Sequence, residues 1–350
     1  MEAYSGKIID AHVHVFGKGT QGVRDMLAFE KEQGYEACNY LSCECMGDAA
    51  QNALGIYLKL CAPENFAFGG LTYRCDCDFA AEMDALWDIG FDGIKMVEDK
   101  PTLRKQLGVP FNDRRYDGFY AKLEEKQIPL LAHVADPEEC WDKDLIPDWA
   151  FAAGYFYGDG TYVEKETLYT EVEDVLTRFP GLRIILAHCF FMSADLERLD
   201  ALMQRHPNVC LDIVSGTEMY WNFGRRPDDW RALFLKYQDR IIYGTDNMNL
   251  YDAREIENAR ITNDLQRRYL TRTRPVHAWD KVTQGIALPQ EVLEKILRGN
   301  FLRLTGGAPR PLNRAAAARY LRARLENKAL ALTEEERAVT AEVLTLLADG

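Results

Sequence analysis

The 350-residue sequence predicts an α/β fold: a (β/α)8 TIM barrel with a long aromatic insertion after the fifth strand and added C-terminal helices. Short apolar runs alternate with helical patterns, eight such runs occur, and no linker or internal repeat divides them. Near-continuous apolar runs are typical of parallel strands that are buried on both faces. A doubly wound parallel sheet is the rival architecture. The expected strands are Lys7–Val15, Glu36–Cys43, Phe66–Tyr73, Gly93–Val97, Ile128–Val134, Leu182–His188, Asn208–Val214 and Arg240–Thr245.

A helical pattern follows each expected strand, and two regions lie outside these eight units. We expect one domain over residues 1–306, the barrel, and a helical extension over residues 307–350. The segment Thr333-Glu334-Glu335-Glu336 has the spacing of a capping box and predicts the start of the last helix. The expected barrel helices are Asp25–Gln33, Ala50–Cys61, Ala80–Ile89, Asp117–Lys126, Lys165–Phe179, Asp195–His206, Asp228–Lys236 and Arg254–Tyr269.

The second region is the long connection from Ala135 to Glu164, which follows the fifth expected strand. A connection of this length is usually functional or disordered, and its many aromatic residues argue against disorder. We expect it to form a lid that lines the substrate pocket through Trp141, Trp149 and Tyr155. A homodimer interface is the alternative, because aromatic residues are also enriched there.

Composition excludes several classes of protein. Lysine and arginine minus aspartate and glutamate gives 42 − 55 = −13, a charge that repels nucleic-acid phosphates. No apolar stretch is long enough to cross a membrane, and no secretory signal is visible. The nine scattered cysteines are typical of reduced thiols. We therefore expect a cytoplasmic protein that acts on a small molecule.

Histidines mark the ends of the expected strands. His12 and His14 are two residues apart in the first strand, so their rings face the same side. His133 ends the fifth strand, and His188 ends the sixth. Asp246 follows the eighth strand. Barrel enzymes keep their active sites at the carboxyl ends of the strands, so these side chains predict a metal site at that face.

These residues resemble the motifs of the amidohydrolase superfamily. The chain is most similar to the amidohydrolase-related branch, which includes aminocarboxymuconate-semialdehyde decarboxylase. The resemblance covers about residues 7–306 and rests on the following segments: Ile9-Asp10-Ala11-His12-Val13-His14, His133, His188, Gly244-Thr245-Asp246 and Ile296-Leu297-Arg298-Gly299-Asn300-Phe301.

The resemblance implies one divalent metal ion held by His12, His14, His133 and Asp246. Zinc is our default, although manganese, iron, cobalt and nickel suit the same donors. Asp246 would also take a proton from the attacking water, and His188 would polarise the substrate or move a proton. The implied alternative has two metals, with a carbamylated Lys95 as the bridge and with His133 and His188 on the second ion.

Four further residues at or after strand ends are candidates for substrate binding. An unmodified Lys95 would pair with an anionic substrate or with Asp246. Arg74 could clamp a substrate carboxylate, and a surface salt bridge is the alternative for it. Glu44 and Glu218 follow the second and seventh strands, where either could contact substrate.

The expected activity is metal-dependent hydrolysis of a small-molecule amide, ester or lactone by a metal-activated water. The alternative is a metal-dependent decarboxylase or other lyase of the same branch that acts on a small carboxylic acid. A phosphoesterase or nuclease fits less well, because related barrels of that group have Glu at the position of Lys95. The strand-end residues alone do not separate hydrolase from lyase.

Overall fold

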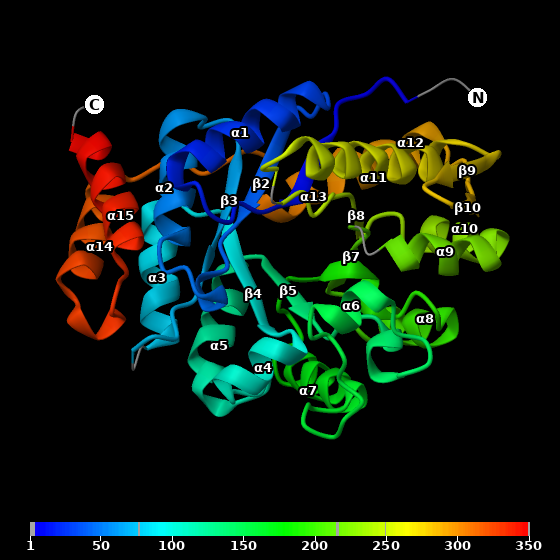
Figure 1. The fold of residues 1–350 in the computed structure, drawn as a ribbon, viewed down its shortest axis with the longest axis horizontal. Coiled ribbons are helices and arrows are strands. Elements are labelled where there is room, and N and C mark those ends of the chain that lie inside the picture. Colours follow the sequence, from blue (N-terminus) through cyan, green and yellow to red (C-terminus); the bar gives the residue numbers. More distant parts are fainter. Residues whose placement is uncertain (1–3, 76–77, 215–216, 249, 349–350) are drawn as a thin grey trace.

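The chain forms a (β/α)8 barrel in the computed structural model, which describes residues 4–75, 78–214, 217–248 and 250–348 (Figure 1). Eight parallel strands pair in the order of the sequence, and this confirms the predicted architecture. Each strand overlaps its expected range. The strands are β1 (Ile9–Val13), β2 (Ala37–Leu41), β3 (Phe66–Gly70), β4 (Gly93–Asp99), β5 (Leu130–Val134), β6 (Ile184–Leu186), β7 (Val209–Asp212) and β8 (Ile241–Ile242).

The ring closes between β1 and the segment that follows β8. The backbone N–H of Asp246 donates to the carbonyl of His12 at 2.8 Å, and the N–H of His14 donates to the carbonyl of Asn247 at 2.9 Å. Val13 and Asn247 form a parallel bridge at the same place. Closure therefore brings the histidines of β1 next to the residues that follow β8.

Apolar side chains fill the interior of the ring. Phe66 and Phe68 of β3 point inward, and Phe301 packs against both, with ring centroids 5.0 and 6.1 Å away. Asn300, the residue before Phe301, donates from Nδ2 to the carbonyl of Ile241 in β8 at 2.7 Å. The segment around Asn300 and Phe301 therefore plugs the barrel at the end opposite the strand-end histidines.

Helices surround the sheet, and most of them bury one face, whereas α2 is buried on all sides over residues 51–59. In α8, for example, Leu199, Leu202 and Met203 are buried at the spacing of a single helical face. All eight expected barrel helices are present. The helices that follow the strands are α1 (Gly19–Glu32), α2 (Gln51–Cys61), α3 (Phe79–Ile89), α4 (Pro101–Leu107), α5 (Asp117–Lys126), α7 (Lys165–Arg178), α8 (Leu196–Arg205), α10 (Pro227–Lys236) and α11 (Ala253–Thr271).

Several short elements were not expected from the sequence. The insertion contains a 3-10 turn over Glu138–Trp141 and the helix α6 (Asp148–Ala152). Helix α9 (Thr217–Arg225) lies between β7 and α10, and it packs against an antiparallel hairpin of β9 (Pro275–Ala278) and β10 (Lys281–Gln284). The barrel ends in α12 (Gln290–Glu294), a π-helical turn and α13 (Asn300–Thr305).

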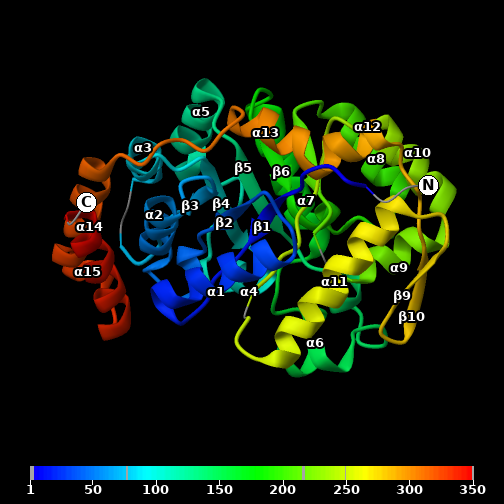
Figure 2. The same ribbon diagram turned by 90° about the horizontal axis from the view of Figure 1, so that it is seen from above.

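Two helices form the C-terminal extension, α14 (Arg314–Glu326) and α15 (Glu334–Ala348). Figure 2 shows both at one side of the barrel, beside α2 and α3. The capping box is confirmed: Thr333 Oγ1 accepts from the N–H of Glu336, and the carboxylate of Glu336 accepts from the N–H of Thr333. The division into two domains stays a prediction. Among the helices of the described residues, none has the length and apolar character needed to cross a membrane.

Candidate metal centre

Two histidines and an aspartate converge at the carboxyl ends of β1 and β8. The Nε2 atoms of His12 and His14 are 3.1 Å apart, and both rings are buried. Oδ1 of Asp246 lies 3.5 Å from Nε2 of His12 and 3.4 Å from Nε2 of His14. The structure thus brings three of the predicted ligands into one group of donor atoms, which we call the ligand triad.

The spacing of the ligand triad fits a metal ion. Ligand atoms about 2.0–2.1 Å from a tetrahedral ion lie about 3.3–3.4 Å from one another, close to the distances between these three donors. Burial, reinforced by the charge of Lys95, lowers the pKa of His12 and His14 well below the usual range. Both rings are therefore neutral, the form that binds a cation. Three protein donors leave one tetrahedral position open.

Hydrogen bonds on the far side of each ring fix the tautomer. Nδ1 of His14 donates to the carbonyl of Leu41 at 3.1 Å, and Nδ1 of His12 donates to Oδ2 of Asp212 at 2.9 Å. With the proton on Nδ1, the lone pair of each ring lies on Nε2, inside the ligand triad. Asp212 was not among the residues predicted from the sequence. Its position near the end of the expected strand 208–214 was the available signal.

A buried carboxylate holds the strand ends that carry the ligands. Asp246 has a φ of +60°, in the left-handed region, so its backbone needs support. Oδ1 of Asp10 accepts from the N–H of Thr245 at 3.0 Å and from the N–H of His12 at 3.1 Å. Asp10 therefore links β1 to the residue that precedes Asp246. The sequence analysis had quoted Asp10 in the motif without giving it a role.

His133 and His188 form a pair beside the ligand triad. Nε2 of His188 lies 3.1 Å from Nδ1 of His133, and the ring centroids of His188 and His12 are 5.6 Å apart. The other nitrogen of His133 faces the carbonyl of Ala135 at 3.1 Å. Within the part of the chain that the structure describes, His133 lies outside the ligand triad. Its role as a ligand and the catalytic role of His188 stay predictions.

Lys95 is buried next to the ligand triad. Its Nζ lies 3.4 Å from Nε2 of His12, and burial lowers the pKa of the ammonium group. This is the position from which a carbamylated lysine would reach two ions, with the His133–His188 pair near the second. An unmodified Lys95 would instead meet the substrate. Both assignments stay predictions.

Arg74, predicted as a possible substrate clamp, forms an ion pair with the C-terminal extension. Its guanidinium pairs with both carboxylate oxygens of Glu336 in α15, at 2.9 and 2.7 Å, and donates to the carbonyl of Gly47 at 2.7 Å. These contacts attach the C-terminal extension to the loops after β2 and β3. They favour the salt bridge over the carboxylate clamp. Glu44 is used in the same way, since it pairs with Arg324 of α14.

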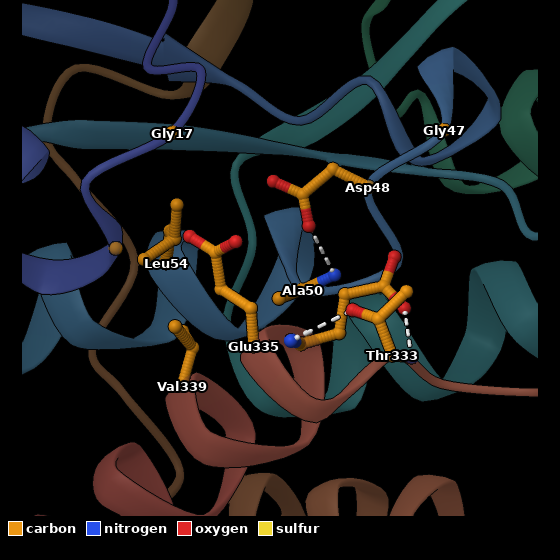
Figure 3. A pocket seen from close by; sticks show the side chains of 10 residues that line it. Gly17, Gly47, Asp48, Ala50, Leu54, Thr333, Glu335 and Val339 are labelled. Carbon is orange, nitrogen blue, oxygen red and sulfur yellow. Dashed lines mark hydrogen bonds between the residues drawn. The ribbon is translucent and has the colours of Figure 1, made fainter.

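A cavity of about 290 Å³ separates α15 from the loops after β1 and β2. Figure 3 shows Asp48 and Glu335 at this cavity, with Asp48 bonded to the N–H of Ala50 at 2.9 Å. Glu336, also in its lining, is already bonded to Arg74. The residues that line this cavity include none of the predicted catalytic, metal or substrate-binding residues. This cavity lies where the C-terminal extension contacts the barrel.

Three of the predicted substrate-binding residues line a second cavity of about 280 Å³: Trp149, Tyr155 and Glu218. Asp136, whose Oδ1 lies 3.5 Å from Nε2 of His133, lines it as well. Trp141 is not among the lining residues, because its indole N–H donates to a backbone carbonyl of the insertion at 3.3 Å. The insertion therefore covers a cavity that begins beside the histidine pair.

A (β/α)8 barrel with two histidines and an aspartate joined at its strand ends has the architecture of a barrel metalloenzyme. The chain belongs to the amidohydrolase family, because a family model described as amidohydrolase matches residues 43–306, more than half of its length. That match begins after His12 and His14, so these two members of the ligand triad are observed independently of it, whereas Asp246 lies within the matched range. No curated protein matches the sequence.

Solved structures share the fold at low sequence identity. One is 4-oxalomesaconate hydratase from Rhodopseudomonas palustris, with a TM-score of 0.52, 15% identity, and coverage of 91% of this chain and 100% of that chain. Another is 5-carboxyvanillate decarboxylase from Sphingomonas paucimobilis, with a TM-score of 0.50, 13% identity, and coverage of 86% and 99%. A third is the IDCase of Metarhizium anisopliae, with a TM-score of 0.52, 11% identity, and coverage of 86% and 97%.

Proposed function

We propose that this chain is a metal-dependent hydrolase that acts on an amide, ester or lactone of a small molecule. The observation that carries the proposal is the ligand triad, whose three donor atoms are spaced for one ion. The Asp246 side chain is 15% exposed, whereas that of His12 is fully buried, so the aspartate borders open space. We propose zinc as the resident ion, since neutral imidazole and carboxylate donors suit it.

The side chains divide the chemistry between them. A bound divalent ion supplies Lewis acidity, which lowers the pKa of a coordinated water and polarises a carbonyl. His12 and His14 hold the ion through Nε2. Asp246 is placed to accept a proton from the attacking water, because its carboxylate lies at the open side of the ligand triad. His188, buried and neutral, is placed to hydrogen-bond the substrate or to move a proton.

The insertion is proposed to exclude water from the substrate. Trp149 and Tyr155 pack at a centroid distance of 6.3 Å and line the cavity that begins at Asp136. Exclusion of water from a site strengthens its electrostatic interactions. A homodimer in which the insertions meet is a second proposal for the same aromatic residues, and Trp149 is 68% exposed in the monomer.

A decarboxylase is the second candidate function. Two of the solved structures with this fold are a 5-carboxyvanillate decarboxylase and an IDCase, and the ligand triad would serve either reaction. Decarboxylation needs a cation for the substrate carboxylate. Arg74 is occupied by Glu336, which leaves Lys95 for that task. Hydrolysis needs no such partner, and we therefore place it first.

Oxygen isotope labelling separates the two candidates. Metal-loaded protein is incubated in ¹⁸O-labelled water with panels of small amides, esters, lactones and carboxylic acids, and the products are read by mass spectrometry. Hydrolysis predicts one ¹⁸O atom in the acid product, and decarboxylation predicts release of CO2 from a carboxylic acid. The His12→Ala variant is the blank. CO2 release without any labelled acid would overturn the hydrolase proposal.

We also propose a cellular compartment for the protein, on the basis of its cysteines. The eight cysteines within the described residues are all free thiols, and six of them are buried. Unpaired thiols of this kind support a reducing compartment, for which we propose the cytoplasm.

A further inference from the structure

One face of α9 lines the cavity beneath the insertion from end to end. Glu218, Trp221, Asn222 and Arg225 all border that cavity. Their spacing of three, one and three residues places them in one stripe along the helix. At a rise of about 1.5 Å per residue, the stripe runs about 10 Å from Glu218 to Arg225. The cavity therefore presents a carboxylate at one end, an aromatic ring in the middle and a guanidinium at the other end.

The carboxylate end of this stripe lies toward the His133–His188 pair. Helix α9 starts soon after β7, and Figure 1 shows it running outward from β7 beside β10. Glu218, Glu139 and Asp136 line the same cavity, and burial together with the negative charges of the other two carboxylates raises the pKa of Glu218 to about 7. Asp136 in turn contacts His133. Glu218 is thus the inner end of the cavity, and Arg225 is the outer end.

At the inner end of the cavity, the charge of Asp136 is already paired with a lysine of the protein. Asp136 accepts two hydrogen bonds from Nζ of Lys100, at 2.6 and 2.7 Å, and one from the hydroxyl of Tyr157 at 2.6 Å. Nζ of Lys100 also lies 4.6 Å from the centroid of the Tyr155 ring. This ion pair leaves little positive charge for a ligand at the inner end.

The outer end carries positive charge that the protein does not use. Arg225 and Lys281 both line the cavity, and among the described residues neither makes an ion pair. Nζ of Lys281, from β10, lies 5.8 Å from the centroid of the Trp221 ring. Thr283 of the same strand donates to the carbonyl of Tyr220 in α9 at 2.6 Å, which fixes the hairpin against the helix. Arg225 and Lys281 therefore lie on the same side of the cavity, on a helix and a strand that are held together by a hydrogen bond.

Arg226, the residue next to Arg225, forms ion pairs and so serves as a comparison. Arg226 pairs with Glu197 at 2.7 Å and with Asp229 at 2.7 Å, and it does not border the cavity. Two consecutive arginines thus have opposite surroundings. Both side chains are exposed, but Arg226 is neutralised by two carboxylates, whereas Arg225 borders the cavity and makes no ion pair among the described residues.

We infer that Arg225 and Lys281 recognise an anionic group, a carboxylate or a phosphate, at the end of the substrate that lies farthest from the metal. A flat apolar segment of the substrate would lie between this group and the reacting bond, against Trp221 and Trp149. Glu218 would accept a hydrogen bond from the N–H next to the reacting carbonyl. The inference rests on the proposed hydrolase function for the reacting end and names the substrate class: an aromatic or apolar amide with an anionic tail.

Binding of three probes tests the inference without requiring turnover. N-benzoylglycine carries a carboxylate, phenyl phosphate carries a phosphate, and N-benzoylglycinamide is the uncharged match of the first. Affinities are measured by calorimetry on metal-loaded protein. We expect at least one anionic probe to bind about tenfold or more tightly than the neutral amide, which identifies the anion. Arg225→Gln should abolish that preference, Lys281→Gln should reduce it, and Arg226→Gln should preserve it.

Three results would overturn the inference: equal affinity of wild-type protein for all three probes, an equal loss in Arg226→Gln, or loss of the preference in metal-free His12→Ala protein. The last result would mean that the anionic group of the probe binds to the metal and not to Arg225 and Lys281. Failure of the proposed function looks different. A protein that hydrolyses no amide, ester or lactone but keeps an Arg225-dependent preference would retain this site and lose the hydrolase assignment.

Discussion

The carboxylate of Asp212 lies 2.9 Å from Nδ1 of His12, and neither side chain is exposed to solvent. This contact joins the end of β7 to the end of β1 across the barrel mouth. It holds the His12 ring in one tautomer and one orientation before any ion arrives. The metal centre is therefore organised by residues that do not themselves touch the ion.

Replacing Asp212 with Asn should weaken metal binding about 10- to 100-fold, the usual effect of losing such a partner. The amide can still accept from the backbone N–H of His188, which now bonds Oδ1 at 2.6 Å, but its NH2 group favours the wrong His12 tautomer. Competition with a chromophoric chelator measures the affinity. Asp228→Asn, at an exposed position of α10, is the control. Equal affinities in the two variants would contradict the assigned role of Asp212.

Removing either histidine of β1 should empty the site. His12→Ala or His14→Ala leaves two members of the ligand triad, so elemental analysis should find no stoichiometric metal, and turnover should be lost. Circular dichroism should still show the barrel, because the cores inside and around the ring do not depend on these rings. Full activity in the double variant after chelation would refute the metal mechanism.

His188→Asn distinguishes one metal from two. As a proton-transfer or polarising group, His188 should be worth about 10²- to 10⁴-fold in turnover, with metal content unchanged. If His133 and His188 instead hold a second ion, the variant should lose half of its metal. Metal content per chain and kcat, measured on the same preparation, separate the two outcomes.

Trp149→Ala tests the insertion as a lid. Trp149 is 68% exposed, so its removal should cost little stability, but it should raise KM severalfold because the cavity loses one wall. Phe151→Ala, exposed on the same helix and absent from the cavity lining, is the matched control. Light scattering after size-exclusion chromatography reports the oligomeric state. Unchanged KM together with a change from dimer to monomer would support the interface and remove the lid.

Arg324 should be the strongest attachment of the C-terminal extension. It is buried, pairs with Glu44, and donates to Thr72 at 2.8 Å and to the carbonyl of Ala49 at 2.7 Å. Removing one partner of a buried ion pair typically costs about 3–5 kcal/mol, which we expect for Arg324→Ala in urea unfolding. Arg322→Ala, exposed on the same helix, should cost less than about 0.5 kcal/mol. Similar losses in both variants would contradict this assignment.

Local pattern was enough to predict the barrel. Each strand is an apolar run, and each long helix has an apolar face, so burial alone selects them. The ligand triad was predicted for a related reason. His12 and His14 share a strand face, and parallel strands of one barrel bring their carboxyl ends to the same rim, where Asp246 also lies. Elements of four or five residues, such as β9 and β10, have too few apolar positions to show a period.

Contacts between segments that are far apart in the sequence could not be predicted from it. Nothing near Arg74 indicates that its partner is Glu336 in the last helix, because that pairing depends on how the extension packs. The same holds for the contact between His133 and His188, whose facing ring nitrogens are 3.1 Å apart. Which carboxylate supports a given histidine is likewise decided by the ring closure that places Asp212 beside His12.

Closure of the ring also gives the ion a mechanical role. The ligand triad takes His12 from the first strand, His14 from just beyond its end, and Asp246 from the segment that follows the last strand, and that last strand has only two residues in its ladder. A bound ion would therefore act as a cross-link over the seam of the barrel. Because it would bind the closed ring in preference to an opened one, we expect metal loading and ring closure to be linked equilibria. We expect removal of the ion to shift the population toward rings with two free strand edges, the kind of edge through which separate chains associate.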